Sequence, residues 1–382
     1  MARRLSGDIA IVGGSLAGLA TGIGLARAGI SVRIYEQSVG EERGGTGLGV
    51  DRALISATTG VDARKDGVIR ALPVVNEGYR ETSTWLAIYR WLRALAGVTD
   101  GLIITESARI EHVHCDHARA YLEGPAGHAS ASIVLGADGY RSVVRCTVSP
   151  EHPFAPYSGF LLWRGLVDES CVSKRLVGKL SLGGERTICA DATRLVIYRV
   201  PGRNGETAPG ARAINFAWYD ASRTSWLHDR GFLVDGEVTG SVPNSAIDDE
   251  LRRELLKLAK QRWSGAASEI LSIAIEQNVV FGTPLAEYLP EQMSRGRIAL
   301  VGDAAHVASP MVGAGFVSGL LDGAAIIRAI EQYGGAAADS GSRALERYDK
   351  ERLGPNRNHV LESLAQTRDL LHSVAQSPYS LA

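Results

Sequence analysis

The sequence predicts an α/β protein with three parts: a mostly parallel sheet, an inserted antiparallel sheet and a C-terminal helix. Three observations predict this class. A strand, a glycine turn, a helix and a second strand open the chain, two later apolar strands end in aspartate turns, and short strands separated by turns crowd between residues 159 and 220. Buried parallel strands are continuously apolar, whereas antiparallel strands are short and punctuated by turn residues.

The opening unit has the pattern of a Rossmann-like dinucleotide site. The apolar strand 8–13 leads into a glycine-rich turn, a helix follows, and the next strand ends at Glu36. Backbone N–H groups at a helix start attract a pyrophosphate, and the helix dipole favours its charge. Gly13 permits the tight turn and Gly18 lets helix and strand approach closely. Glu36 is suited to accept hydrogen bonds from a ribose and repels a 2′-phosphate.

One position departs from the usual GxGxxG pattern. Ser15 stands where the second glycine is expected. A residue with a Cβ must avoid positive φ there, and the Ser15 hydroxyl is able to donate to the phosphate. The alternative is a βαβ turn that binds nothing, and the motif alone does not separate NAD from FAD. The predicted cofactor contacts in this turn are Gly13, Gly14, Ser15, Leu16, Ala17 and Gly18.

Two later motifs favour FAD. An apolar strand leads into Asp138-Gly139, and another leads into Gly302-Asp303, so both aspartates lie where ligands bind in open α/β sheets. A loop of small residues at 310–315 follows, in which backbone N–H groups can approach a flat ring. Each pair alone is typical of a simple turn, but the order and spacing of the two motifs together are far more specific for a cofactor site.

These motifs resemble the single-component FAD-dependent aromatic hydroxylases, the family of p-hydroxybenzoate hydroxylase. The resemblance runs from Ile9 to about Arg357 and includes the motif pairs at 136–139 and 302–306. Within the family, the turn GGSLAG and the segment 162–166 are most similar to the 2,6-dihydroxypyridine hydroxylases. The resemblance implies a Rossmann-like FAD-binding domain, an inserted antiparallel-sheet substrate domain and a closing helix. An asparagine common in the family is replaced at Phe316-Val317.

The resemblance also implies site residues. Gly13, Ser15 and Gly18 would face the FAD pyrophosphate, and Glu36 the adenosine ribose. The other cofactor contacts it implies are Arg90 near the phosphates, Asp138 in a motif that supports both FAD and the incoming nicotinamide cofactor, Gly302 and Asp303 at the ribitol or pyrophosphate region, and Pro310, Gly313, Ala314 and Gly315 beside the flavin ring. For Arg90 a solvated helix position is an equally good interpretation.

The domain boundaries follow from this arrangement. Strands are predicted at 159–167, 179–182, 186–189, 195–200 and 213–219, helices at 248–263 and 268–276, and a strand returning to the cofactor domain at 278–285. Residues 60–81 carry weak signals and stay unassigned. The predicted segments are 1–65, 84–150 and 281–340 for the FAD-binding domain, 66–83 and 151–280 for the substrate domain, and 341–382 for the C-terminal helical segment.

The resemblance implies a monooxygenase. NADH or NADPH would bind transiently, because only one dinucleotide turn is present, and would reduce FAD. A flavin hydroperoxide would then hydroxylate a small hydroxylated aromatic or N-heteroaromatic ring. The candidates for a pocket base or polar donor are Arg199, Tyr219 and His306. Each has a structural alternative. Arg199 would be a surface charge on a strand, Tyr219 a sheet residue whose hydroxyl is already bonded, and His306 a partner of the backbone beside the Gly-Asp turn. Trp163 is a candidate pocket wall, though core packing is the commoner role.

Composition narrows the classes further. The 41 Lys and Arg against 42 Asp and Glu give a net charge of −1, which removes the attraction for nucleic acid. No apolar run reaches the roughly 18 residues of a membrane span. The four separated cysteines predict free buried thiols and a cytoplasmic protein. The cluster His112, His114 and His117 is interpreted as solvated, so no metal is expected. The expected partners are the small aromatic substrate and O2, and a homodimer is one open expectation.

Three alternatives stay open. A flavoprotein monooxygenase of a larger polycyclic or antibiotic-like substrate would differ only in pocket volume. A noncatalytic flavin-binding redox sensor would show no stimulation of NAD(P)H consumption by aromatics. A plain NAD-dependent dehydrogenase would be colourless, and the Asp138 and Asp303 motifs disfavour it.

Overall fold

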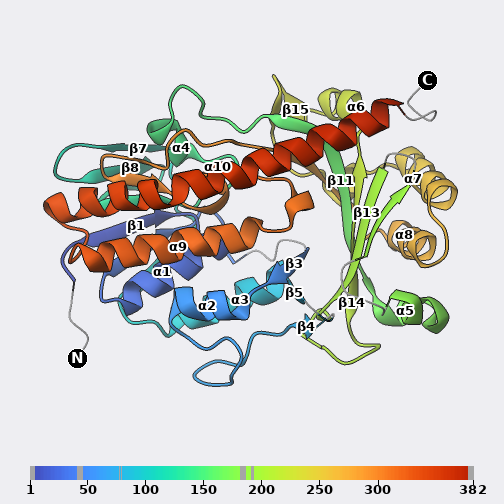
Figure 1. Ribbon diagram of the computed structural model, residues 1–382, viewed down its shortest axis with the longest axis horizontal. Coiled ribbons are helices and arrows are strands. Elements are labelled where there is room, and N and C mark those ends of the chain that lie inside the picture. Colours follow the sequence, from blue (N-terminus) through green and yellow to red (C-terminus); the bar gives the residue numbers. More distant parts are fainter. Residues whose placement is uncertain are drawn as a thin grey trace.

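The computed structural model describes residues 5–40, 46–76, 78, 80–180, 186–190 and 193–376. Two large sheets stand beside each other, a mostly parallel one and an antiparallel one (Figure 1). Each sheet has its own apolar core, and one long helix runs past both. The chain is therefore built in two parts.

The parallel sheet places the strand that opens the chain near its centre. Its order is β18 (Ser294–Arg295), β19 (Ile298–Leu300), β10 (Ile133–Gly136), β1 (Asp8–Val12), β2 (Ser31–Tyr35) and β6 (Leu102–Thr105). All neighbours are parallel except β18 and β19. The carboxyl ends of β1, β10 and β19 therefore meet at one edge, and each of the three predicted motifs begins there.

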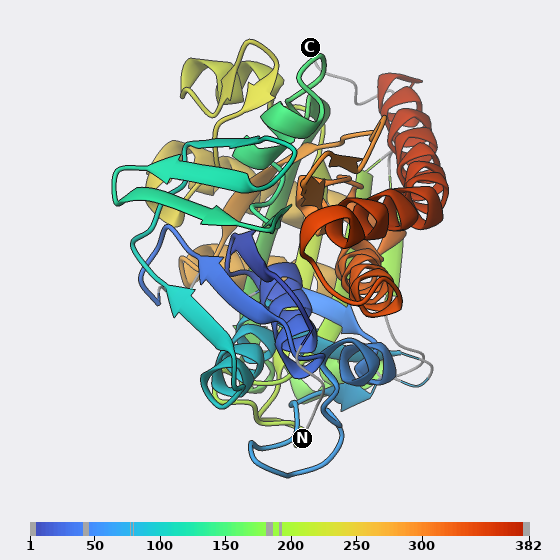
Figure 2. The same ribbon diagram turned by 90° about the vertical axis from the view of Figure 1, so that its left-hand side faces the viewer.

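Both faces of this sheet are covered, which is why its central strands are apolar throughout. One face carries α1 (Leu16–Arg27) and α3 (Trp85–Gly97), with α2 (Arg52–Thr59) and α9 (Gly315–Gln332) packed on α1. The other carries α4 (Val143–Val148) and a small antiparallel sheet of β7 (His112–Cys115), β8 (Ala120–Gly124) and β9 (Gly127–Ala131). Figure 2 shows α9 lying along α10 (Ala338–Gln376).

The antiparallel sheet has the order β12 (Arg186–Ala190), β13 (Thr193–Val200), β14 (Ala213–Asp220), β11 (Tyr157–Asp168) and β17 (Phe281–Ala286). Helices α5 (Lys174–Leu180), α7 (Asp249–Arg262) and α8 (Ala266–Glu276) lie on its outer side in Figure 1. Odd-numbered residues of β11 and β13, and even-numbered residues of β14, enter the core under these helices. The alternate residues form the inner face of the sheet, and several of them join a second apolar cluster with Met311, Leu370 and Leu371.

A third sheet joins the two parts. Its strands are β3 (Gly47–Val50), β5 (Glu81–Thr84) and β4 (Val75–Asn76), and it rests against β13 and β14. The Gly47 amide donates to Asn215 Oδ1 at 2.8 Å, and the Thr82 hydroxyl donates to the Arg199 carbonyl at 2.6 Å. Part of the region left unassigned by the sequence therefore docks the cofactor domain onto the inner face.

The remaining elements are short. They are α6 (Thr224–Asp229), β15 (Leu233–Val234), β16 (Glu237–Val238) and the 3₁₀ turns η1 (Glu169–Cys171), η2 (Asn244–Ala246), η3 (Gly302–Ala304) and η4 (Pro310–Val312). Two of these turns, η3 and η4, hold the second aspartate motif and the small-residue loop.

The predicted α/β class is confirmed, and two local predictions are wrong. The strand at 278–285 does not return to the cofactor domain, because β17 pairs antiparallel with β11 as the fifth strand of the substrate sheet. The domain boundary at residue 280 is therefore too early. At the predicted strand 179–182, residues 179 and 180 end helix α5, and residues 181 and 182 lie outside the described residues.

Candidate cofactor and substrate site

The glycine turn between β1 and α1 has the backbone geometry that close approach demands. Gly13 has φ +103°, and a Cβ there would lie 2.4 Å from the Ala137 carbonyl oxygen. A Cβ on Gly18 would lie 2.1 Å from the Gly13 carbonyl oxygen. Only glycine fits at either position. Ser15 has φ −86°, so the prediction that it avoids positive φ is confirmed.

The first turn of α1 is open to an anion. Ser15 is the N-cap residue, but its side chain makes no capping hydrogen bond. The first N–H groups of a helix have no partner within the helix, and the helix dipole adds positive potential there. Together with the close-packed glycines, this turn forms a cradle that suits a pyrophosphate.

The two aspartate motifs contact this cradle. The Ala137 Cβ lies 3.2 Å from the position that a Gly18 Cβ would occupy. Gly302, with φ +60°, lies against α1, where its Cβ position is 3.1 Å from the Ala17 Cβ. Three segments far apart in the sequence therefore converge on one helix start, as the resemblance implied.

Asp303 leaves its carboxylate without a partner. The carboxylate makes no hydrogen bond or ion pair with any described residue, and the side chain is exposed. Desolvation by nearby protein atoms raises the pKa of the Asp303 carboxyl, while His306 and Arg145 oppose that rise. An unpaired carboxylate accepts hydrogen bonds from hydroxyl groups. FAD offers hydroxyls on its sugar and ribityl chain and a pyrophosphate for the cradle, so the residues present fit FAD.

The two other predicted acids are engaged within the protein. Glu36 accepts the Gly14 amide at 2.8 Å and both the amide and hydroxyl of Ser38 at 2.9 and 2.7 Å. Asp138 accepts the Ser142 hydroxyl at 2.5 Å and the Val143 amide at 2.8 Å, so it caps the start of α4. Burial raises the pKa of Asp138 despite these bonds. Glu36 borders the cradle, whereas a contact from Asp138 to a nicotinamide stays a prediction.

Sequence reasoning assigned no role to Arg145, which ties the two aspartate motifs together. Its fully buried guanidinium donates to the carbonyls of Ala304 at 3.0 Å and Pro153 at 2.7 Å, and also to that of Tyr140. It lies over the Tyr288 ring at 4.3 Å. A lone arginine in the apolar run Val143–Val148 was the available signal, since arginine is rarely buried unless its N–H groups are bonded.

His306 belongs to a buried polar network. Its Nε2 lies 2.7 Å from Asp322 Oδ2, and Asp322 also accepts from the Gly302 amide, Arg352 and Asn356 at 3.0, 2.8 and 2.9 Å. These bonds connect η3, α9 and α10. Only 1% of His306 is exposed. These bonds give His306 a structural role, so we propose no catalytic role for it.

The predicted pocket role of Arg199 is wrong. Arg199 lies on the helix-covered face of β13, where its Nε donates to Glu169 at 2.9 Å and another nitrogen donates to the Val177 carbonyl. Arg212 binds the same carboxylate at 2.6 Å. Alternation along a strand explains the outcome, because Arg199 shares its face with Leu195 and Ile197.

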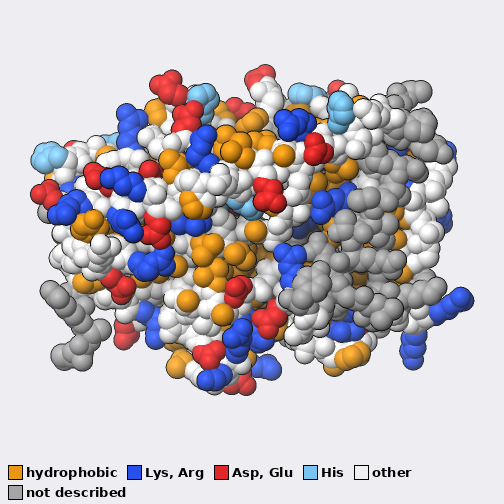
Figure 3. Space-filling view, in the orientation of Figure 1, with side chains coloured by type: hydrophobic (Ala, Val, Ile, Leu, Met, Phe, Trp, Pro, Cys, Tyr) orange, Lys and Arg blue, Asp and Glu red, His pale blue; other side chains and the backbone are white. Residues whose placement is uncertain are grey.

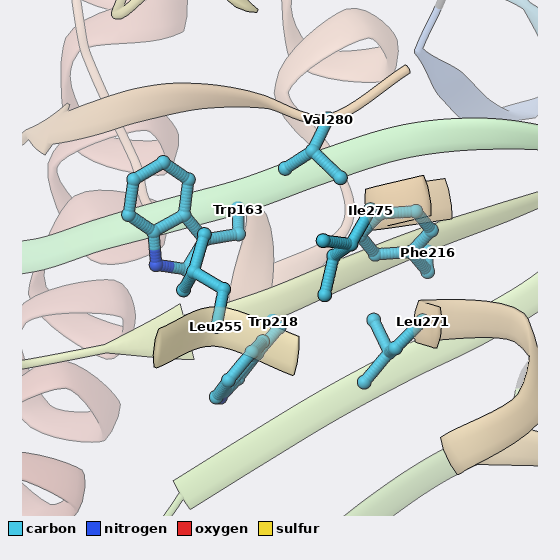
Figure 4. Close-up of a pocket in the computed structure, with 7 residues that line it drawn as sticks. All are labelled: Trp163, Phe216, Trp218, Leu255, Leu271, Ile275 and Val280. Atoms are coloured by element: carbon cyan, nitrogen blue, oxygen red, sulfur yellow. The ribbon is translucent and has the colours of Figure 1, made fainter. Parts of the chain in front are cut away.

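Trp163 is also on the far face and does not wall a substrate pocket. Figure 4 shows it in a cavity of the helix-side core whose seven lining residues come from the sheet, α7, α8 and the start of β17. The cavity admits no water molecule. The Trp163 indole donates to Asp220 at 3.0 Å. It is therefore core, the role that the sequence already favoured.

Tyr219 is the one catalytic candidate on the inner face. It is buried, its ring meets Phe160 edge-to-face at 6.0 Å, and the Arg194 guanidinium lies 5.7 Å from the ring centre. Arg194 also donates to the Met311 carbonyl of η4 at 3.4 Å. Tyr219 is therefore near the loop that the resemblance places beside the flavin.

The remaining predicted contacts lie at accessible positions. Pro310, Gly313 and Gly315 are exposed, and the Gly313 carbonyl accepts from Arg80 at 3.1 Å. Arg90 occupies an exposed position of α3. A part for Arg90 in phosphate binding stays a prediction.

Several expectations about composition also have structural outcomes. Cys115, Cys146 and Cys171 are free, but Cys146 and Cys171 are exposed rather than buried, and the side chain of Cys189 lies outside the described residues. His112, His114 and His117 are all exposed. In the part of the chain that the structure describes, no cluster of potential ligands is arranged to hold a metal, and no helix has the length and hydropathy to cross a bilayer. Charges of both signs are mixed over the face in Figure 3.

Comparisons with known proteins identify relatives that are FAD-dependent monooxygenases by name and family models for FAD-binding domains. A family model described as FAD binding domain-like matches residues 157–280, and one described as FAD binding domain matches residues 256–362. The chain is 27% identical over 337 residues to the 2,6-dihydroxypyridine 3-monooxygenase of Paenarthrobacter nicotinovorans, covering 80% of this chain and 78% of that protein. It is 25% identical over 358 residues to the aurachin C monooxygenase/isomerase of Stigmatella aurantiaca, covering 84% and 80%.

A solved structure shares the whole fold. The structure of 2,6-dihydroxypyridine-3-hydroxylase from Arthrobacter nicotinovorans matches with a TM-score of 0.78 and 22% identity, covering 99% of this chain and 96% of that one. Both large sheets and the closing helix therefore have counterparts in that structure.

Proposed function

Because the chain belongs to the FAD-dependent monooxygenases of the aromatic hydroxylase type, we propose that it hydroxylates a small hydroxylated aromatic or N-heteroaromatic ring with O2 and NADH or NADPH. The observation that carries the proposal is the convergence of three motifs on the first turn of α1, with the Asp303 carboxylate left unpaired beside it.

Different residues around the cradle would bind different parts of FAD. The backbone from Gly13 to Gly18 would bind the pyrophosphate, Glu36 the adenosine ribose, and Asp303 a hydroxyl of the ribityl chain. The segment 310–315 would border the flavin ring. FAD supplies the redox chemistry when bound, and the protein supplies orientation and exclusion of water.

The inner face of the antiparallel sheet would bind the substrate ring. Phe160, Leu162 and Ala217 are buried there, and Met311 of η4 packs on the same cluster. An apolar wall of this kind excludes water from the reacting ring and strengthens each polar contact within it. Tyr219 would orient a ring hydroxyl by hydrogen bonding.

A larger substrate is the second candidate. One relative with 25% identity carries the name aurachin C monooxygenase/isomerase, so ring size is not fixed by membership of this group. The redox sensor and the plain dehydrogenase are not retained, because the relatives are named monooxygenases.

The test is a screen of hydroxypyridines, hydroxybenzoates and purines with the purified holoenzyme. We expect NAD(P)H consumption that depends on a ring substrate and yields an equal amount of hydroxylated product by mass spectrometry. Catalase-coupled detection of hydrogen peroxide separates hydroxylation from uncoupled oxidase turnover. Product only from polycyclic rings would favour the second candidate, and flavin-free protein that consumes no NAD(P)H would contradict both.

A further inference from the structure

Three buried nitrogen donors on the inner face of the antiparallel sheet have no hydrogen-bond partner among the residues that the structure describes. They are Arg164 Nε, Arg194 Nε and Asn215 Nδ2, and we call these three residues the donor patch. The side chain of Arg164 makes no hydrogen bond or ion pair with the described residues. Buried polar groups in native proteins are nearly always paired, so three unpaired donors on one face need an explanation.

Strand register gathers the donor patch around one small residue. Ala217 of β14 lies directly opposite Arg164 of β11, and Asn215 follows two residues along the same strand. Arg194 of β13 lies opposite Tyr219, which is two residues from Ala217 on the other side. Directly opposed Cβ atoms are about 5 Å apart and same-face neighbours along a strand about 7 Å apart. Arg164 and Asn215 are diagonal neighbours about 7–8 Å apart, which is about the size of one substituted six-membered ring, whereas the backbone position of Arg194 lies about 14 Å from that of Asn215.

Two elements contact the patch, strand β3 and the turn η4, and η4 belongs to the loop predicted to flank the flavin. The Gly47 amide of β3 donates to Asn215 Oδ1, which fixes this amide group and leaves Nδ2 without an acceptor. Arg194 donates to the Met311 carbonyl of η4, the loop predicted to flank the flavin. The unpaired donors therefore lie between β3 and η4.

Two buried arginines on the helix-covered side of this sheet are paired with carboxylates. Arg199 of β13 is held by Glu169 at 2.9 Å, and Arg223, which follows β14, is held by Asp220 at 2.8 Å. Burial lowers the pKa of Arg164, and the groups that oppose this shift are two phenols, those of Tyr198 and Tyr219, rather than a carboxylate. Desolvation of the Arg164 charge therefore destabilises the ligand-free protein, because no neighbouring carboxylate compensates for it.

We propose that Arg164 and Asn215, with Arg194, form a subsite that binds the substrate as a ring anion carrying at least two acceptor oxygens. This inference rests on the proposed function and narrows its substrate class. Every unpaired group in the patch is a donor, so the complementary ligand edge consists of acceptors. A guanidinium hydrogen-bonded to a ring oxygen also favours the deprotonated ring. Cationic rings and rings without acceptor oxygens do not fit.

The test measures binding without turnover. Isothermal titration of the holoenzyme, without NAD(P)H, uses 2,6-dihydroxypyridine, 4-hydroxybenzoate and uric acid as acceptor-rich probes and 2,6-dimethoxypyridine as the alkylated counterpart. Loss of one charged hydrogen bond weakens binding by a factor of about 10 to 100. We expect Arg164→Met to lower the affinity for whichever acceptor-rich probe the wild type binds by that factor. The affinity for 2,6-dimethoxypyridine should stay unchanged.

Further variants separate a binding role from a structural one. Arg164→Lys keeps the charge and should recover part of the affinity. Asn215→Asp keeps an oxygen to accept the Gly47 amide and removes the Nδ2 donor, so it should weaken binding of the same probe with wild-type FAD content and circular dichroism. Arg253→Gln, an exposed arginine on α7, is the matched control and should bind as the wild type does. Equal affinity of wild type and Arg164→Met for the acceptor-rich probe, or binding of none of these probes by the wild type, would overturn the subsite.

Failure of the subsite and failure of the proposed function give different results. Arg164-dependent binding of a ring anion without any hydroxylated product would support the subsite and contradict the proposed function. Hydroxylation of a ring that Arg164→Met binds and converts normally would keep the function and remove the subsite.

Discussion

At the scale of single residues, the molecule pairs some buried charges and leaves others for a ligand. Arg199, Arg212 and Glu169 satisfy one another under the helices of the antiparallel sheet. Among the described residues, the side chains of Asp303 and Arg164 have no such partners: Arg164 Nε is buried, whereas Asp303 is exposed. A molecule bound beside them would supply the missing hydrogen-bond partners and so stabilise the folded state.

Asp303→Ala should weaken FAD binding. Loss of a hydrogen bond to a carboxylate costs about 1–3 kcal/mol, a factor of about 5 to 150 in the dissociation constant. Fluorescence titration of the apoprotein with FAD measures this change. Asp229→Ala, at an exposed position of α6, is the control and should bind FAD normally. An unchanged dissociation constant in Asp303→Ala would remove Asp303 from the cofactor site.

Glu169 should make stability depend on pH in the acidic range. Burial raises its pKa, but hydrogen bonds from Arg212, the Gly210 amide and Arg199 outweigh this and hold the pKa at about 2, below the ordinary 4.5. A carboxylate with a depressed pKa stabilises the fold above its ordinary pKa, and this contribution is lost as pH falls from 4.5 towards 2.

Glu169→Gln should therefore lower the free energy of unfolding by about 3 kcal/mol near neutral pH, because two arginines lose their charged partner. The difference from the wild type should shrink as the pH falls below 4.5. Urea unfolding at a series of pH values measures it, with the exposed Glu151→Gln as control. A difference that stays constant with pH would show that Glu169 acts by packing alone.

At the scale of elements, local patterns predict what depends on neighbours in the sequence. The unit β1–α1–β2 follows from an apolar run, a glycine turn and a helix stop within about 30 residues. The sheet β3–β5–β4 does not, because its strands are two to four residues long and its docking partner Asn215 is 168 residues from Gly47. Short strands carry little periodicity, and their pairing is decided by tertiary contacts.

The candidate site divides in the same way. The cradle and Asp303 were predictable because they belong to contiguous motifs at strand ends. Arg145 and the donor patch were not, since their roles arise from contacts between distant segments. The error at Arg199 was avoidable, because alternation along residues 193–200 already put it on the face of Leu195 and Ile197.

Gly18→Ala should disrupt the first element pair. Its Cβ would lie 2.1 Å from the Gly13 carbonyl oxygen, so α1 must move away from β1 and the cradle is lost. We expect protein that is flavin-free or unfolded, as judged by visible absorbance and circular dichroism. Gly97→Ala is the matched control, because a Cβ at the end of α3 meets nothing within 4 Å. A stable Gly18→Ala protein with full FAD content would contradict the close-approach argument.

At the scale of the whole molecule, α10 connects parts that fold around separate cores. Arg352 and Asn356 of this helix bind Asp322 of α9, and Asp322 in turn accepts the amide of Gly302. Further along, Leu370 and Leu371 pack against the inner-face cluster of the antiparallel sheet. One helix thus contacts the parallel-sheet part, the site and the antiparallel sheet.

Asp322→Asn should weaken this connection. Burial raises the pKa of Asp322, but His306 and Arg352 lower it further, so the ionised form is the stable one. Removing the charge leaves Arg352 without its carboxylate and should cost about 3–5 kcal/mol in the free energy of unfolding. Thermal unfolding measures the loss, and faster proteolysis within α10 locates it. Asp369→Asn, exposed on the same helix, should behave as the wild type does, and equal melting of both variants would argue against the network.

The 39-residue length of α10 also sets how molecules reach the interior. Pro355 within this helix removes one backbone hydrogen bond, so rigidity between the two parts rests on the contacts that α10 makes with each of them and not on the helix alone. If those contacts hold the two parts together, substrate and product would pass through a small opening, and the loop 310–315 beside α10, whose Pro310, Gly313 and Gly315 are exposed, is the segment suited to form it. Turnover would be paced by this narrow movement rather than by a clamshell motion of the whole enzyme.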